Sequence, residues 1–378
     1  MANSYSGLVA TVYGAWDTVS RELTGMIPSA FINSDAARVA KGQEERYPVS
    51  VVGDPEDVTY GESAGESAGD DITYGSMTIQ KEKNIKITWT GHDQLSLGST
   101  HNVILQDQFA QAMRKLVNAI ESDGTALYSQ FSRAYGTPGT TPFQTAGDYT
   151  DASFVRKILV DNGAPQADLK LVLDTTAGAF IRGKQGQYQH TGEQVLRTQG
   201  VLYDMNGLMI RESAQIKTHT KGTGSGYLVN DATDIAVGDT DIILDTGSGT
   251  VLAGDIVNFA SAGTHNYIVG TGVAAPGTIV LNNPGARQAI ADNAAMTIGN
   301  SYVANMAFHK MAVHLLTRLP PMPTLGDSAD SQIVVTDPLT GLTFEILTYK
   351  QERQVTSKVA ISWGWKVVKP EHTALLLG

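Results

Sequence analysis

The 378-residue chain has no cysteine, and no apolar run approaches the roughly 20 residues that a helix needs to cross a bilayer. The absence of cysteine excludes disulfide bonds, thiolate nucleophiles and cysteine-ligated metals. Basic residues are scarce, because 27 Lys and Arg stand against 38 Asp and Glu and give a net charge of -11. A protein that grips nucleic acid through its phosphates needs clustered basic side chains, so that function is not expected. An acidic chain can still enclose nucleic acid.

Motifs for catalysis are missing as well, since the chain has neither a G-x-S-x-G elbow nor a P-loop. Gly270, Gly272 and Ala275 resemble a dinucleotide fingerprint, but another strand pattern follows in place of the helix that would receive a pyrophosphate. His309 and His314 lack the spacing of a zincin motif. We therefore expect no catalytic residue, no cofactor and no metal, and the chain is not predicted to be an enzyme.

The longest regular pattern present is helical and covers residues 103–136. Large apolar side chains recur there every three or four positions, which places them on one face of a helix. At about 1.5 Å per residue this segment predicts a rod of roughly 48 Å. Gly124 interrupts the stripe, and because glycine weakens a helix by about 1 kcal/mol relative to alanine, Gly124 is a candidate hinge.

Two arm-like patterns precede this rod. Residues 8–26 keep helical spacing, so they predict an amphipathic helix that either packs on its own core or docks on another subunit. Residues 47–89 alternate between apolar and polar, which predicts two strands of a long hairpin. A lone two-stranded ribbon is marginal in water, so we expect it to lie on another copy of the chain.

The tip of this hairpin is acidic and has no basic residue to balance it. The alternative interpretation is a disordered acidic loop, which fits the tip but not the alternating flanks. An ordered tip needs opposite charge from elsewhere, and the last strands supply it. The predicted contact carboxylates are Glu62, Glu66, Asp70 and Asp71. The predicted partner surface on a neighbouring copy consists of Lys350, Arg353, Lys358, Lys366 and Lys369.

The rest of the chain mixes helix and strand patterns without a strict βαβ rhythm, so the predicted class is α+β. A short helix is expected at 152–160, a buried strand at 168–174 with a helix after it, and a tight turn at Asn206-Gly207. Residues 217–300 have turns every eight to twelve positions, typical of a small all-β barrel or sandwich. Helical spacing returns at 301–319, and strands are expected from 332 onward.

Several segments carry a resemblance to a known family. They are TIQKEKNIKITWTG before the rod, VLAGDIVNFA, NYIV and GTIVLNNPGA in the β-rich part, and NMAFHKMAVHLLTRLP after it. In this order of parts the chain resembles the tailed-phage major capsid protein with the Hong Kong 97 fold, and more narrowly the coat protein family of phage P twenty-two.

That resemblance implies a division of the chain into named parts. They are an N-terminal arm (1–40), an extended loop (41–93), a spine helix with a peripheral domain (94–173, completed by 332–378), an axial domain (174–216, completed by 301–331) and an inserted β-barrel-like domain (217–300). It also implies a non-enzymatic coat protein of a virion. Such subunits form hexamers and pentamers of an icosahedral capsid around a scaffolding protein, with a portal protein and in some cases a decoration protein. They assemble in the host cytoplasm, without a membrane, and enclose double-stranded DNA without sequence-specific binding.

Two other functions stay open from the residues alone. A bacterial surface or appendage protein would use the β-rich part for adhesion, although the N-terminus lacks the positive lead of a secretory signal. An enzyme with a site assembled from scattered residues is the third possibility, and its largest polar pocket would be the place to look.

Overall fold

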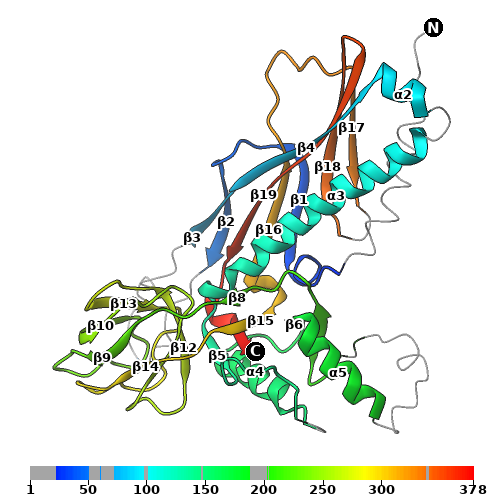
Figure 1. The fold of residues 1–378 in the computed structure, drawn as a ribbon. Helices are drawn as coiled ribbons and strands as arrows, with labels where there is room; N and C mark the ends of the chain where they lie inside the picture. The colour runs from blue at the N-terminus through cyan, green and yellow to red at the C-terminus, as the bar shows by residue number, and fades with distance from the viewer. Residues whose placement is uncertain are drawn as a thin grey trace.

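The computed structural model describes residues 23–50, 60, 72–97, 101–145, 148–187, 202, 204–337 and 340–378. The described part is elongated (Figure 1). A long helix and long strands run together along one half, and a β-rich part and a mixed helix-strand part lie at the other end. Helices and mainly antiparallel sheets occur in separate layers, so the predicted α+β class is confirmed.

Short and long helices alternate with the strands along the described chain. The α-helices are α2 (Gly91–Leu97), α3 (His101–Thr125), α4 (Thr150–Asp161) and α5 (Thr175–Gln187). The single-turn helices are η1 (Ile27–Ser29), η3 (Ala126–Gln130), η4 (Lys310–Ala312) and η5 (Pro370–His372). The expected helices at 152–160 and after 174 correspond to α4 and α5, so both predictions are confirmed.

The first large sheet runs the length of the upper half of Figure 1. Its strands are β1 (Phe31–Arg38), β4 (Lys81–Thr90), β16 (Val313–Leu319), β17 (Ser331–Thr336), β18 (Thr343–Gln351) and β19 (Gln354–Val367). Strand β19 pairs with β4 on one side, and with β16 and then β18 on the other. The strands expected after 332 are confirmed by β17, β18 and β19.

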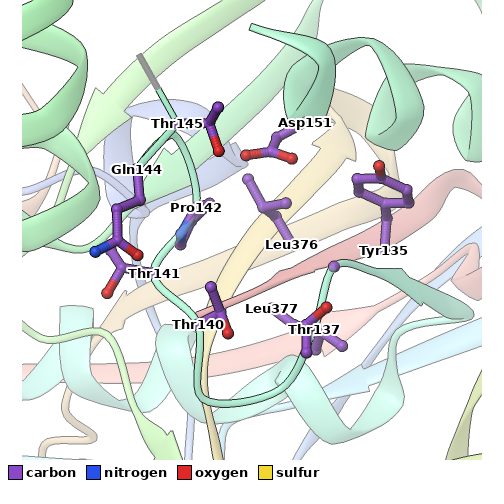
Figure 2. Close-up of a pocket in the computed structure, with 11 residues that line it drawn as sticks. Tyr135, Thr137, Thr140, Thr141, Pro142, Gln144, Thr145, Asp151, Leu376 and Leu377 are labelled. Carbon is purple, nitrogen blue, oxygen red and sulfur yellow. The ribbon is translucent and has the colours of Figure 1, made fainter. Parts of the chain in front are cut away.

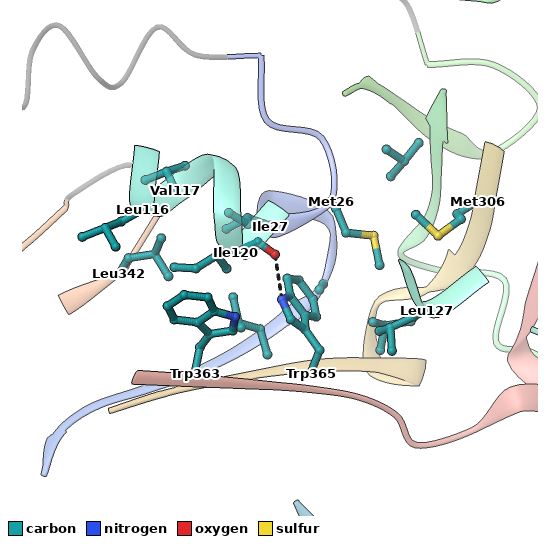
Figure 3. Packing of buried hydrophobic residues seen from close by; sticks show 14 of the residues in the cluster. Met26, Ile27, Leu116, Val117, Ile120, Leu127, Met306, Leu342, Trp363 and Trp365 are labelled. Carbon is teal, nitrogen blue, oxygen red and sulfur yellow. Dashed lines mark hydrogen bonds between the residues drawn. The ribbon is translucent and has the colours of Figure 1, made fainter. Parts of the chain in front are cut away.

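Helix α3 lies across this sheet and buries one face against it (Figure 3). Its buried side chains include Met113, Leu116, Val117 and Ile120, which are the stripe that the sequence predicted. Trp365 of β19 packs beneath them and donates its indole N–H to the Ile120 carbonyl oxygen at 2.9 Å. An apolar helix face against an apolar sheet face is what fixes the rod to the rest of the molecule.

The predicted single helix over 103–136 is wrong in its length. Helix α3 ends at Thr125, so it has 25 residues and spans about 38 Å at 1.5 Å per residue. The apolar stripe continues beyond it, but η3 and β5 (Arg133–Tyr135) carry it into the same core. Strand β5 pairs with two other strands, and those backbone hydrogen bonds outweigh the local helical preference.

The second large sheet joins the β-rich part to the mixed part. Besides β5 it contains β6 (Leu169–Leu173), β7 (Leu208–Glu212), β8 (Thr218–His219), β9 (Ser225–Val229), β10 (Asp241–Ser248), β11 (Ile256–Phe259), β12 (Asn266–Thr271), β13 (Gly277–Leu281), β14 (Met296–Ile298), β15 (Tyr302–His309) and β20 (Thr373–Leu377). Helices α4 and α5 bury their apolar faces against β6 and its neighbours. The buried strand expected at 168–174 is confirmed by β6.

The helix expected at 301–319 is wrong, because the segment forms strands β15 and β16 around the single turn η4. Strand β15 lies between β6 and β20, and nearly all its side chains are buried. A strand that is buried on both faces has apolar residues at nearly every position, so its sequence does not show the alternation of apolar and polar residues that identifies a strand. The helical spacing of Ala304, Phe308, Met311 and Leu315 was therefore fortuitous, and Met311 is 46% exposed.

The two-stranded ribbon predicted before the rod is present as β2 (Glu44–Ser50) and β3 (Ile72–Thr78), which pair antiparallel. The return strand is not continuous, because the chain leaves the ribbon after Thr78 and enters the main sheet as β4. Gly364 of β19 permits this crossing, since a Cβ atom there would lie 2.0 Å from the Thr78 carbonyl oxygen.

Residues 217–300 are all-β in the described structure, as their composition predicted. They bury a core of their own, built from aromatic and branched side chains such as Tyr227, Phe259, Tyr267 and Ile279. The turn at Asn206-Gly207 is also confirmed, with φ angles of 52° and 72°. Most of the helix expected at 8–26 lies outside the described residues.

Candidate assembly surfaces

The base of the β2–β3 ribbon is tied to the main sheet by a buried arginine. The Arg318 guanidinium donates to both carboxylate oxygens of Glu45 on β2, with 2.6 Å to Oε1, and its Nη1 donates to the Asn33 carbonyl oxygen at 3.0 Å. The Arg318 side chain is 5% exposed. Because this charge-assisted contact involves a buried guanidinium, it holds the base of the ribbon against the main sheet.

A second arginine closes the edge next to this base. Arg38, at the end of β1, donates to the Pro320 carbonyl oxygen at 2.6 Å and pairs with the Glu345 carboxylate. Glu345 is buried and also accepts a hydrogen bond from the Gln332 side-chain amide at 3.0 Å. Because a buried carboxylate is costly without partners, these contacts make the strand order at this edge specific.

The segment that leads in from the N-terminal residues is held on the spine by one carboxylate. Glu121 on α3 is fully buried and accepts the backbone N–H groups of Gly25, Met26 and Ile27 at 2.7, 2.6 and 2.9 Å. Burial raises the pKa of the Glu121 carboxyl, and the amide donors counteract that rise. The contact joins residues more than ninety positions apart, so Glu121 anchors the start of the described chain to α3.

Gly124, the predicted hinge, lies in the last turn of α3. A Cβ atom at this position would meet Trp365 Cζ2 at 2.7 Å and Met26 Cγ at 3.0 Å. The glycine therefore allows the Trp365 ring and the anchored segment to approach the helix backbone closely. Whether Gly124 also bends as a hinge stays a prediction.

The end of the spine meets the β-rich part through a buried polar chain. The Tyr128 hydroxyl lies 3.0 Å from His219 Nδ1, and His219 Nε2 lies 2.8 Å from Asp255 Oδ1. Asp255 also accepts the backbone N–H groups of Gly222 and Leu252. His219 and Asp255 are buried and Tyr128 is half-buried, so this hydrogen-bonded network joins two parts of the fold.

Among the described residues, the outer end of the spine exposes several apolar side chains. Helix α2 has no buried residue, and Leu95 within it is 84% exposed. Val103 at the start of α3 is 62% exposed, and Tyr74 on the ribbon is 68% exposed. Single exposed apolar residues are ordinary, but Leu95 and Val103 lie on α2 and the start of α3, the end of the molecule opposite the β-rich part (Figure 1).

Of the predicted contact between the acidic tip and the basic partner surface, the structure describes the basic residues. Glu62, Glu66, Asp70 and Asp71 lie outside the described residues. On the predicted partner surface, Lys350 pairs with Asp330 at 2.9 Å, and Lys358 lies 4.4 Å from the centre of the Tyr349 ring. Lys366 donates to the Ser76 carbonyl oxygen at 2.6 Å. Lys366 thus supports the ribbon of its own chain.

The five basic residues form a line and not one patch. Lys350 and Arg353 lie at the end of the β18–β19 hairpin, whereas Lys369 follows the other end of β19. The 14 residues of β19 span about 46 Å at 3.3 Å per residue.

Within the described ranges, no group of three or more His, Asp or Glu side chains is arranged to hold a metal ion. The same ranges contain no helix with the length and apolar character that crossing a bilayer requires. Glu121 was missed in the sequence, although it shares the buried face of α3 with Val117 and Gly124. A carboxylate inside an apolar helical stripe is the signal that marks such an anchor.

No protein-family model and no curated protein matches the chain. One similar solved structure is from Mycobacterium phage Che8, at 12% identity, covering 89% of this chain and 85% of that chain with a TM-score of 0.47. The capsid structure of the cyanophage P-SCSP1u is 11% identical over 94% of this chain and 88% of that chain, with a TM-score of 0.49. A virus-like particle from Pyrococcus furiosus is 9% identical over 97% and 98%, with a TM-score of 0.43. All three TM-scores lie below 0.5.

Proposed function

We propose that this chain is a major capsid protein that assembles with copies of itself into the icosahedral shell around the double-stranded DNA of a tailed bacteriophage. The observation that carries the proposal is the β2–β3 ribbon. Its apolar cluster with the main sheet is small, built on Met77, Ile79 and Leu316. A two-stranded ribbon is marginal in water by itself, so the remainder of this one needs a surface outside its own chain.

The other projecting parts support the same proposal. Helix α2 and the first turn of α3 expose Leu95 and Val103 at the end opposite the β-rich part. When surfaces at the two ends of a subunit contact neighbouring copies, the copies form an extended array. The array becomes a closed shell when the rotation from each copy to the next brings the array back to its start. The contact of the buried Arg318 guanidinium with Glu45 gives the ribbon a fixed direction, which a closed shell requires.

The proposal includes the finer features that the sequence resemblance implies. These are hexamers and pentamers, a scaffolding protein, a portal protein, assembly in the host cytoplasm, and the division into N-terminal arm, extended loop, spine, peripheral, axial and inserted parts. A decoration protein belongs to the same set. The role is structural and not catalytic.

The test is the size of the purified full-length chain, measured by sedimentation and negative-stain microscopy. We expect closed particles or multi-subunit rings. A stable monomer under all assembly conditions, including molecular crowding, would refute the proposal.

A variant pair shows which surface forms the contacts. Tyr74→Ser on the ribbon should reduce particle yield, and Val237→Ser in the β-rich part should not, although these two side chains are similarly exposed at 68% and 62%. Circular dichroism of each variant confirms that the subunit is folded. Equal particle yields from the two variants would exclude the ribbon as the assembly contact.

A further inference from the structure

A cavity of about 320 Å³ lies where the β-rich part meets α4. Strand β5 pairs here with β12, and the α4 helix packs beside them. The volume is at the lower end of the roughly 300–1,000 Å³ typical of small-ligand sites. Arg133 and Tyr135 of β5, Lys157 and Asp161 of α4, and His265 before β12 are among the residues that line it.

The charge around this cavity is mainly positive. Arg133 and Lys157 line it, and Arg287 lies close enough to Arg133 to lower the pKa of that guanidinium, although burial of Arg133 is the larger cause. The carboxylate present, that of Asp161, pairs with Lys157 at 2.8 Å. In an acidic chain, a concentration of cations around one cavity is a local feature that attracts anions.

Arg133 is the central group of this site. The residue is 4% exposed, and its Nη2 donates to the Asn162 side-chain oxygen at 2.8 Å. Its Nε is buried and has no acceptor among the described residues. A buried donor on a charged group is costly to leave unpaired, so Nε calls for an acceptor that this part of the chain does not supply.

A neighbouring pocket gives a contrast. It shares Tyr135, Gly136 and Thr137 with the first cavity, but hydroxyl groups dominate its lining (Figure 2). Among its described lining residues the charged one is Asp151, which already accepts the Phe143 backbone N–H at 2.7 Å. This pocket does not favour an anion, so the positive charge belongs to the Arg133 cavity alone of the two.

We propose that the Arg133 cavity is an oxyanion-binding site, which takes a phosphate or a carboxylate group. The guanidinium presents its N–H donors in a planar fork, and both groups offer oxygen atoms that match such a fork. Lys157 and His265 would face the same group from α4 and from the β11–β12 connection. A bound anion would then join β5, α4 and the β-rich part across their seam.

The test uses the full-length chain with inorganic phosphate and, separately, acetate. His265 is the reporter, because burial lowers its pKa and the cations Arg133 and Lys157 lower it further. We expect each anion to raise the His265 pKa in a saturable manner, measured from the Cε1–H resonance. Lys157→Ala should weaken binding about 5-fold, since an exposed cation is worth up to about 1 kcal/mol. The matched control Lys115→Ala, on the exposed face of α3, should bind as the wild type does.

Arg133→Met should abolish the response, and Lys157→Ala keeps the proposal testable if the buried substitution prevents folding. No His265 response to either anion, or equal binding by Lys157→Ala and the wild type, would overturn the proposal. Phosphate binding to assembled particles then distinguishes the two possible sources of the bound group, a second copy of the chain and free phosphate. A carboxylate from a second copy would exclude phosphate from particles, whereas free phosphate would bind subunits and particles alike. Only this last comparison rests on the proposed function, since the titration itself does not require assembly.

Discussion

Removing the Glu121 carboxylate should release the segment that it holds on the spine. Glu121 accepts three buried backbone N–H groups, from Gly25, Met26 and Ile27. Each buried donor left without an acceptor costs about 1–3 kcal/mol, so Glu121→Ala should lose about 3–5 kcal/mol of local stability after partial relaxation. Glu121→Gln keeps one acceptor oxygen but turns an N–H₂ group toward the donors, so it should lose about 1–3 kcal/mol.

Hydrogen exchange of the backbone amides at 23–30 measures this loss directly. A tenfold change in protection corresponds to about 1.4 kcal/mol, so Glu121→Ala should speed exchange there by about 10²-fold or more. Exchange on the far end of α3 should change less, because local opening leaves the sheet contacts intact. Asp107→Asn, on the exposed face of the same helix, is the matched control and should leave exchange at 23–30 unchanged.

Unchanged exchange at 23–30 in Glu121→Gln and in Glu121→Ala would refute the anchor. Global unfolding of Glu121→Ala would make exchange rise in every segment at once. In that case Glu121→Gln, which conserves volume, decides between a local anchor and a general contribution to the core.

Gly124→Ala should destabilise the fold by about 1–3 kcal/mol, measured by denaturant unfolding, because its Cβ would meet Trp365 at 2.7 Å. If Gly124 is also a hinge, the same variant should change the balance between precursor and expanded particles, which an unchanged particle diameter would contradict. Replacing Glu62, Glu66, Asp70 and Asp71 of the acidic tip with Lys should block particle formation without unfolding the subunit. Assembly of the unmodified chain should weaken with added salt. The control variant reverses the charges of Asp231, Asp234 and Asp292 in the β-rich part. Burial lowers the pKa of His314 from its ordinary value of 6.5, so the unfolded chain binds this proton more tightly. The stability that neutral His314 contributes is therefore fully present above pH 6.5 and is lost as the pH drops toward the lowered pKa. His314→Gln should therefore make the thermal unfolding midpoint depend less on pH between about pH 7.5 and about pH 5.5. The same pH dependence in the variant and the wild type would contradict this.

Local sequence patterns were enough to predict the elements that have one buried face and one solvent-exposed face. The alternating flanks of the acidic segment predicted strands, although most of the returning flank forms β4 in the main sheet and not the ribbon partner of β2. The stripe from Phe109 to Ile120 predicted the buried face of α3. Asn206-Gly207 predicted its turn because few residue pairs tolerate two positive φ angles. In these places a local rule about period or backbone conformation is enough, since each element keeps one face in water.

Tertiary packing determined the elements that are buried on both faces and the contacts between residues that are distant in sequence. Strands β15 and β16 are covered on both faces, so their buried positions carry no period that separates strand from helix. The end of α3 at Thr125 depends on the pairing of β5 with β12 and β20. Glu121 finds its amide donors more than ninety residues away, and Arg133 meets Lys157 and His265 across a seam between parts. Such contacts follow from three-dimensional packing, because neither residue of a distant pair alters the local pattern around the other.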